Sequence, residues 1–148
     1  MAETEYPKFD KNCCLKIDLD NMRFDMMLKI VSRRFHIIRK FGITFKNAFV
    51  FDTAKGEHLY LEFQNDDKWQ ALDFRDKIFL QLVMGSDMNR EAFNWLRAKN
   101  DITWNILFIR KYDEKGELIS EEKYNEESSK KFDSAYSGFL TSAKWLKK

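Results

Sequence analysis

The order of hydrophobic periodicities in the first half of the chain constrains the fold most. Residues 13–19 alternate between apolar and polar side chains, which is typical of a strand with one buried face. Residues 24–38 repeat apolar side chains at intervals of three and four, which indicates a helix. Two further alternating segments, 43–52 and 58–63, flank the turn-like residues 53–56 and predict a β-hairpin. The chain therefore opens with a strand, a helix and two strands.

The second half of the chain is less uniform. Residues 67–84 fit both a helical and an alternating period, and we predict a helix because the stretch is long and lacks a turn signal. A strand over the same residues is the alternative. Residues 87–99 predict a short helix. Residues 103–112 and 117–124 predict a second hairpin, whose first strand is apolar on both faces like an interior strand and whose second is polar like an edge.

We predict one α+β domain, since 148 residues suit a single hydrophobic core. The element order is that of a ferredoxin-like or RNA-recognition-type β-α-β-β-α core with an added helix, a C-terminal β-hairpin and a tail helix. We place the domain at residues 1–127 and a basic, aromatic tail helix at residues 128–148. Aromatic residues make up 16% of the chain, and most of these rings are needed for the core.

The cysteines and the N-terminus favour a cytoplasmic protein. Cys13 and Cys14 are adjacent, and neighbours in an extended strand point to opposite faces, so a disulfide between them would be strained. The first five residues, MAETE, lack the basic start and the apolar core of a signal peptide. No apolar run approaches the roughly 20 residues that a membrane-spanning helix needs. We therefore expect no membrane as a partner and an intracellular location.

Positive charge is concentrated although the net charge is only +2. Residues 22–46 are strongly basic, residues 113–127 are acidic, and the end of the chain is basic again. A basic stripe on a helix neutralises phosphates, and exposed aromatic rings stack on unpaired bases. The predicted nucleic-acid-binding residues are Lys29, Arg33, Arg34, His36 and Lys40 on the first helix, Phe49, Phe51 and Tyr60 on the sheet, and Arg90 and Arg97 on the helix at 87–99.

A small set of acidic and histidine side chains suggests a second kind of site. Asp18 and Asp20 lie two residues apart on one face of a strand end, where two carboxylates can hold a divalent metal. His58 opens a later strand, and Asp113 ends the strand that begins at residue 103. The alternative is a purely structural role, in which Asp18 and Asp20 only end a strand and cap the following helix.

This order of residues resembles that of archaeo-eukaryotic-type primases. The first motif of that family is two acids separated by one residue, which Asp18 and Asp20 match. The second is serine, any residue, histidine, and here Gly56 stands before His58 in place of the serine. The resemblance implies Asp18, Asp20, His58 and Asp113 as candidate catalytic residues and a divalent metal at the first two. The missing serine and the short chain imply a reduced relative without polymerase activity.

We therefore expect a small protein, of viral or mobile-element type, that binds single-stranded DNA or RNA during replication or processing without catalysis or a cofactor of its own. The sequence has no glycine-rich phosphate loop and no serine in a glycine-flanked turn, which argues against an enzyme. One alternative is a structural or assembly subunit, such as a virion or tail-tube component. Another is a regulator that binds a protein partner or a second copy through the first or the C-terminal helix. A metal-dependent primase-like nucleotidyltransferase is the least favoured.

Overall fold

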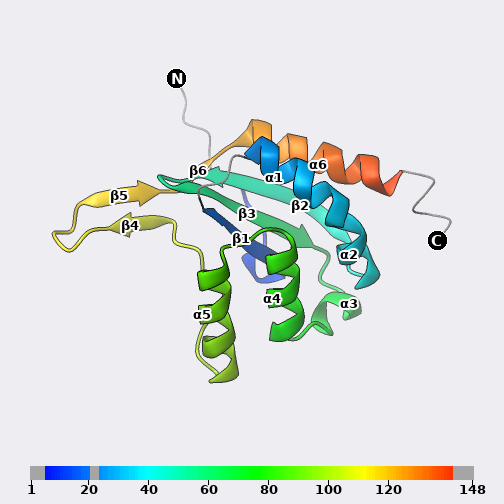
Figure 1. Ribbon diagram of the computed structural model, residues 1–148, viewed down its shortest axis with the longest axis horizontal. Coiled ribbons are helices and arrows are strands. Elements are labelled where there is room, and N and C mark those ends of the chain that lie inside the picture. The colour runs from blue at the N-terminus through cyan, green and yellow to red at the C-terminus, as the bar shows by residue number, and fades with distance from the viewer. Residues whose placement is uncertain (1–5, 21–23, 142–148) are drawn as a thin grey trace.

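The computed structural model describes residues 6–20 and 24–141 and shows an α+β protein. A four-stranded antiparallel sheet with strand order β1-β3-β2-β6 lies at its centre, and a two-stranded hairpin, β4-β5, projects from the body (Figure 1). The strands are β1 (Cys14–Asp20), β2 (Phe45–Asp52), β3 (Gly56–Phe63), β4 (Arg110–Tyr112), β5 (Leu118–Glu121) and β6 (Lys123–Tyr124). The helices are α1 (Phe24–Val31), α2 (Phe35–Lys40), α3 (Asp67–Gln70), α4 (Phe74–Val83), α5 (Met88–Lys99) and α6 (Glu126–Leu140), with short 3₁₀ turns at Lys11–Cys13 and Ser32–Arg34.

The predicted order of strand, helix and hairpin in the first half is confirmed. β3 pairs antiparallel with both β1 and β2, so β1 and β2 run in the same direction with β3 between them. The ferredoxin-like topology is not confirmed, because the chain after β3 forms three helices and returns to the sheet as β6, which pairs with β2. β1 therefore stays at an edge of the sheet.

The main core lies between the sheet and the helices α1, α2 and α6. The predicted apolar face of the first helix is buried, although a 3₁₀ turn divides that helix into α1 and α2. The buried residues on this face are Phe24, Met27, Val31, Phe35 and Ile38. They pack against alternate residues of the strands, including Leu15, Ile17, Leu59 and Leu61.

Residues 67–84 are helical, as predicted, and not a strand. They form α3 and α4, because Asp66 caps the first helix and Asp73 caps the second in a capping box with Asp76. Trp69 is buried, whereas Phe79 is 50% exposed and Gln81 is fully buried. Gln81 is buried because its side chain hydrogen-bonds to β1 and to α5.

The prediction of an interior strand at residues 103–112 is wrong. Only the last three residues form a strand, β4, which pairs with β5 and not with the central sheet. Asn105 adopts a left-handed conformation, with φ 63°, that interrupts an extended chain. Leu107 is buried against the second face of the sheet, whereas Ile106 is 61% exposed. The segment therefore buries Leu107 where it crosses the sheet face, while apolar residues on its other side are exposed.

Side chains from α4, α5 and the junction between them hydrogen-bond to backbone groups of the edge strand β1. The Gln81 Oε1 atom accepts a hydrogen bond from the backbone N–H of Lys16 (2.9 Å), and the Ser86 Oγ atom accepts one from that of Asp18 (3.1 Å). The Arg90 guanidinium donates to the backbone oxygen of Lys16 (2.8 Å). An edge strand with its backbone groups satisfied does not invite pairing with another chain.

The predicted tail is a helix that packs against β2. α6 begins at Glu126, so the expected boundary between residues 127 and 128 falls within its first turn. Its side chains Ser129 and Asp133 accept hydrogen bonds from the backbone N–H groups of Val50 and Ala48 (both 2.8 Å). Phe132, Tyr136 and Phe139 from this helix join the main core. Residues 142–148 of the expected tail lie outside the described residues. No helix in the described ranges is long and apolar enough to cross a bilayer.

Candidate functional site

Three of the sequence-predicted site residues meet in one cavity. Asp18 and His58 are directly opposite each other in the pairing of β1 with β3, and Asp20 follows two residues later on the same face. All three line a cavity of about 290 Å³ at the base of the β4-β5 hairpin. Lys55 and Lys111 also line it and supply positive charge. Residues far apart in the sequence are thus brought together by strand register.

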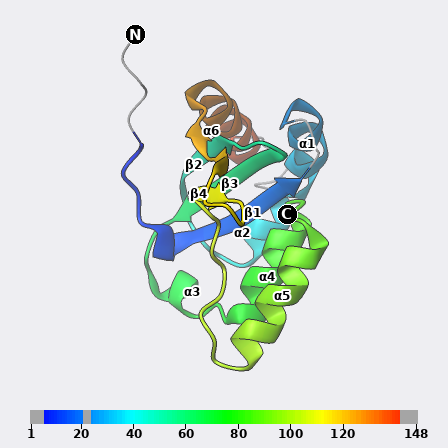
Figure 2. The same cartoon turned by 90° about the vertical axis from the view of Figure 1, so that its left-hand side faces the viewer.

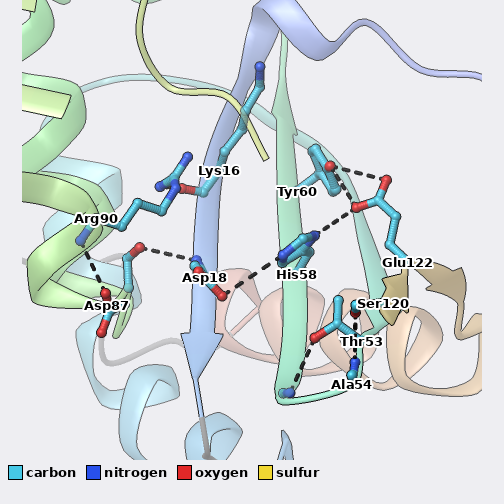
Figure 3. A network of polar contacts seen from close by, with 12 residues as sticks. Lys16, Asp18, Thr53, Ala54, His58, Tyr60, Asp87, Arg90, Ser120 and Glu122 are labelled. Atoms are coloured by element: carbon cyan, nitrogen blue, oxygen red, sulfur yellow. Dashed lines mark hydrogen bonds and ion pairs between the residues drawn. The ribbon is translucent and has the colours of Figure 1, made fainter. Parts of the chain in front are cut away.

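The ring of His58 is held in one orientation. Its side chain is 1% exposed, and its Nδ1 atom lies 2.8 Å from Oε2 of Glu122 (Figure 3). Because a carboxylate accepts hydrogen bonds, this contact places the ring proton on Nδ1. The Nε2 atom then faces the cavity, 3.9 Å from Oδ1 of Asp18. A histidine oriented by a carboxylate in this way presents a basic nitrogen to a ligand.

Glu122 belongs to the site but was not among the predicted residues. It is 4% exposed and also accepts hydrogen bonds from the hydroxyls of Tyr6 (2.6 Å) and Tyr60 (2.9 Å). Its backbone N–H donates to the backbone oxygen of Ile109 (2.8 Å), which fixes the position of the residue. In the sequence Glu122 is one of several acids between residues 113 and 127, so no local signal separates it from its exposed neighbours.

Asp18 sits in an electrostatically mixed environment. Burial raises the pKa of its carboxyl group above the usual value, electrostatic interactions with the His58 ring and the Arg90 guanidinium oppose this, and Asp20 and Asp87 add to it. The backbone of Asp18 is fixed as well, because its oxygen accepts a hydrogen bond from the N–H of Asp87 (2.8 Å). The carboxyl therefore projects from a rigid strand into the cavity.

The cavity does not contain a preformed metal cage. Within residues 6–20 and 24–141 no three His, Cys, Asp or Glu side chains are grouped as metal ligands. Asp18 and Asp20 offer two carboxylates, which suits a magnesium ion that keeps several waters and takes further ligands from phosphate oxygens. The donor set therefore fits a cation that enters together with a phosphate ligand.

Asp113, the third acid of the primase-like pattern, does not join the cavity. It lies in the turn of the β4-β5 hairpin, where its Oδ1 atom accepts hydrogen bonds from the backbone N–H groups of Lys115 and Glu117 (both 2.9 Å). Its position beside β1 would require β4 to pair with β1, and β4 pairs with β5. The side chain of Asp113 stabilises a turn.

The predicted basic stripe is only partly available to a ligand. Lys29, Arg33 and Lys40 are exposed on the outer side of the first helical segment, which consists of α1, the 3₁₀ turn at Ser32–Arg34 and α2. Arg34 instead donates from Nη1 to the backbone oxygen of Val83 (2.8 Å) and so ties this segment to α4. His36 is half-buried. The three exposed cations remain candidates for phosphate contacts.

The predicted aromatic residues lie on the opposite face of the sheet from the basic stripe. Phe51 and Tyr60 are buried there in a second apolar cluster. Phe9 stacks on Phe49 with ring centroids 4.2 Å apart, and Tyr6 stacks on Phe51 at 4.9 Å. The N-terminal segment thus covers these rings. Because the basic residues and the rings lie on opposite faces of the sheet, they cannot contact the same short stretch of a single-stranded nucleic acid.

The two predicted arginines of α5 differ in their surroundings. Arg90 points inward and donates to Glu91 (2.6 Å) and to Asn105 (2.9 Å) in addition to β1. Arg97 is exposed. Arg90 therefore serves the packing of α5 against β1.

No protein-family model matches the chain, and neither does any curated protein or solved structure. The chemistry of the chain must therefore be inferred from its own geometry. The feature with the most definite chemistry is the cavity beside His58, where a fixed imidazole, two carboxylates and two lysines converge.

Proposed function

We propose that this protein acts on nucleic acid by binding a nucleotide phosphate, with a divalent cation, in the cavity beside His58. The convergence of Asp18, Asp20 and His58 in one cavity carries this proposal. If Asp18 and Asp20 only ended a strand and capped a helix, there would be no reason for them to lie in one cavity with an oriented histidine and two lysines.

Each part of the cavity suits a part of such a ligand. The ammonium groups of Lys55 and Lys111 can contact phosphate oxygens, while Asp18 and Asp20 can hold the cation that those oxygens also bind. Phe108 and Ile119 give the cavity an apolar side, which suits a sugar or a base. Its volume is near the lower end of the roughly 300–1,000 Å³ typical of ligand sites, so a nucleotide would extend beyond it.

The resemblance to primases supports this proposal at two of its three motifs. The acidic pair and the histidine meet in the cavity, whereas Asp113 stays in the hairpin turn. Nucleotide binding is accordingly the function we propose, in keeping with the expectation of a relative without polymerase activity.

Isothermal titration of a nucleoside triphosphate in the presence of magnesium tests the proposal. We expect binding that is lost on chelation, and an affinity at least about tenfold weaker in Asp18→Asn, which removes a charged ligand of the cation. His58→Gln should weaken binding to a similar degree. Asp113→Asn is the matched control, because that acid lies outside the cavity and should leave affinity unchanged. No binding at millimolar ligand, or equal losses in Asp18→Asn and Asp113→Asn, would contradict the proposal.

A second candidate function is sequence-independent binding of single strands by the first helical segment. Lys29, Arg33 and Lys40 are exposed there, and within the described residues none of them forms an ion pair. Cations without protein partners can neutralise phosphates and release their counterions.

Fluorescence anisotropy of a labelled oligonucleotide at two salt concentrations tests this candidate. Replacing Lys29, Arg33 and Lys40 by alanine should weaken binding several-fold at low salt and reduce its dependence on salt, since each lost contact lowers the slope by about one. Arg75→Ala, an exposed cation on α4, is the control. Affinity that does not change with salt would rule the candidate out.

A further inference from the structure

Two rings of the N-terminal strap, residues 6–9, are stacked on rings of β2. Phe9 lies on Phe49 with centroids 4.2 Å and planes 10° apart, and Tyr6 lies on Phe51 at 4.9 Å and 29°. The rings of Tyr6 and Phe9 are themselves nearly parallel, at 11°. In Figure 2 the strap, in dark blue, runs as an extended chain along one side of the molecule into β1. Parallel rings that each cover a ring of the sheet are placed as two neighbouring unpaired bases would be.

The rings beneath the strap continue the row of residues that lines the cavity. Phe51 lies directly opposite His58 in the pairing of β2 with β3, and Phe49 lies opposite Tyr60. Asp18 lies opposite His58 on the other side of β3. Residues opposite each other share a sheet face, and so do residues two apart on a strand, at a spacing of roughly 7 Å. A nucleic-acid strand with a phosphate in the cavity therefore has these rings directly beside it.

The strap is attached less firmly than a core element. Within the described part of the chain, no backbone hydrogen bond joins the strap to the sheet. Its side-chain contacts are the two stacked pairs and the hydroxyl of Tyr6 on Glu122 (2.6 Å), and Tyr6 remains 40% exposed. The next residue, Asp10, is anchored, because its N–H donates to Glu62 (3.0 Å). A segment with few buried contacts opens at low cost, so the strap can leave the sheet by turning at Asp10.

Positive charge lies beside the strap. The Nζ atom of Lys11 is 4.8 Å from the centroid of the Tyr6 ring. Tyr6 also borders a second cavity, of about 510 Å³, which Arg110 and Lys123 help to line. Arg110 pairs there with Glu121 (3.0 Å), whereas Lys123 forms no ion pair within the described residues. Cations next to stacking rings are typical of grooves that follow the backbone of a single strand.

We infer that Phe49 and Phe51 form a stacking site for two unpaired bases of single-stranded nucleic acid, which the strap occupies until a strand displaces it. This inference rests on the proposed function, because the cavity beside His58 holds the adjoining phosphate. The strap competes with the bases and shields the rings from water when no strand is bound. Stacking on an aromatic ring tolerates any base, so the site selects unpaired bases and not a sequence.

Fluorescence anisotropy of a labelled oligothymidylate of about 12 nucleotides tests the inference on the full chain. Replacing Tyr6 and Phe9 together by alanine should tighten binding at least about fivefold, because two stacked pairs no longer compete with the bases. Phe49→Ala added to this variant should weaken binding by about the same factor, since one base loses its ring. Phe93→Ala, at an exposed ring on α5, is the matched control and should change the affinity in neither background. Circular dichroism verifies that each variant is folded.

Nuclear magnetic resonance of the original chain observes the strap directly. Stacking shifts the ring protons of Tyr6 and Phe9, and these ring-current shifts should disappear as the oligothymidylate saturates the protein. A duplex of the same length should not produce this change, because its bases are paired. Ring signals that stay unchanged at saturation, a double alanine variant that binds no tighter, or a duplex that acts like the single strand would overturn the inference.

Asp18→Asn separates this inference from the proposed function. If Asp18→Asn weakens binding of the magnesium nucleotide while the alanine changes in the strap leave oligothymidylate affinity unchanged, the cavity binds its ligand and the inference fails. If the strap changes tighten oligothymidylate binding while Asp18→Asn affects neither ligand, the stacking site stands and the proposed function fails.

Discussion

Glu122 accepts hydrogen bonds from the hydroxyls of Tyr6 and Tyr60 and contacts Nδ1 of His58. Its carboxylate therefore links the N-terminal segment, the second apolar cluster and the cavity. Neither tyrosine lines the cavity, so both affect the site only by hydrogen-bonding to this carboxylate. A single buried acid thus determines which nitrogen of His58 faces a ligand.

Glu57 is the residue whose titration should be visible in the stability of the protein. Its burial, followed by the nearby charge of Asp52, raises the pKa of its carboxyl group from 4.5 to about 7. The Oε2 atom is buried and has no hydrogen-bond partner among the described residues. Between pH 4.5 and about pH 7 the folded chain binds more protons at Glu57 than the unfolded chain does. The free energy of unfolding therefore falls as the pH rises through this range.

We predict that Glu57→Gln removes this contribution. The variant should be more stable than the original chain at pH 8, by about 1 kcal/mol after allowance for solvent screening at a half-exposed group. At pH 4 the two chains should differ little. Urea unfolding at several pH values measures this, with Glu114→Gln in the exposed hairpin turn as the control. Equal pH profiles for Glu57→Gln and the original chain would show that Glu57 does not titrate as described.

At the scale of elements, the edge strand β1 depends on the junction between α4 and α5. Ser86 accepts a hydrogen bond from the backbone of Asp18 (3.1 Å) and donates one to Glu91 (2.6 Å). The same residue thus holds both the strand that bears the cavity acids and helix α5.

We predict that Ser86→Ala destabilises the protein by about 1–3 kcal/mol, because it leaves the backbone N–H of Asp18 without its partner and removes one of the two hydrogen bonds to Oε2 of Glu91. Ser137→Ala, at an exposed position on α6, should change stability by less than about 0.5 kcal/mol. Chemical unfolding measures both. If the two variants were equally stable, Ser86 would not hold β1.

At the scale of the whole molecule, the sequence predicts elements better than it predicts which surfaces meet. The opening strand, helix and hairpin follow from clear periodicities, and strand alternation correctly placed Asp18 and Asp20 on one face. The segment at 103–112 was misassigned because apolar residues on both sides of a chain occur in an interior strand and in a coil that crosses a sheet. Glu122 could not be found, because its partner His58 is 64 residues away and lies on a different strand.

The imidazole nitrogen resonances of His58 test the central claim most directly. In the free protein, nuclear magnetic resonance should show the proton on Nδ1, as the contact with Glu122 requires. Adding a magnesium nucleotide should shift the Nε2 resonance of His58 in a saturable manner, while the resonances of α1 and α2 remain unchanged. A proton on Nε2 in the free protein, or a bound nucleotide that leaves both His58 nitrogens unaffected, would contradict the account.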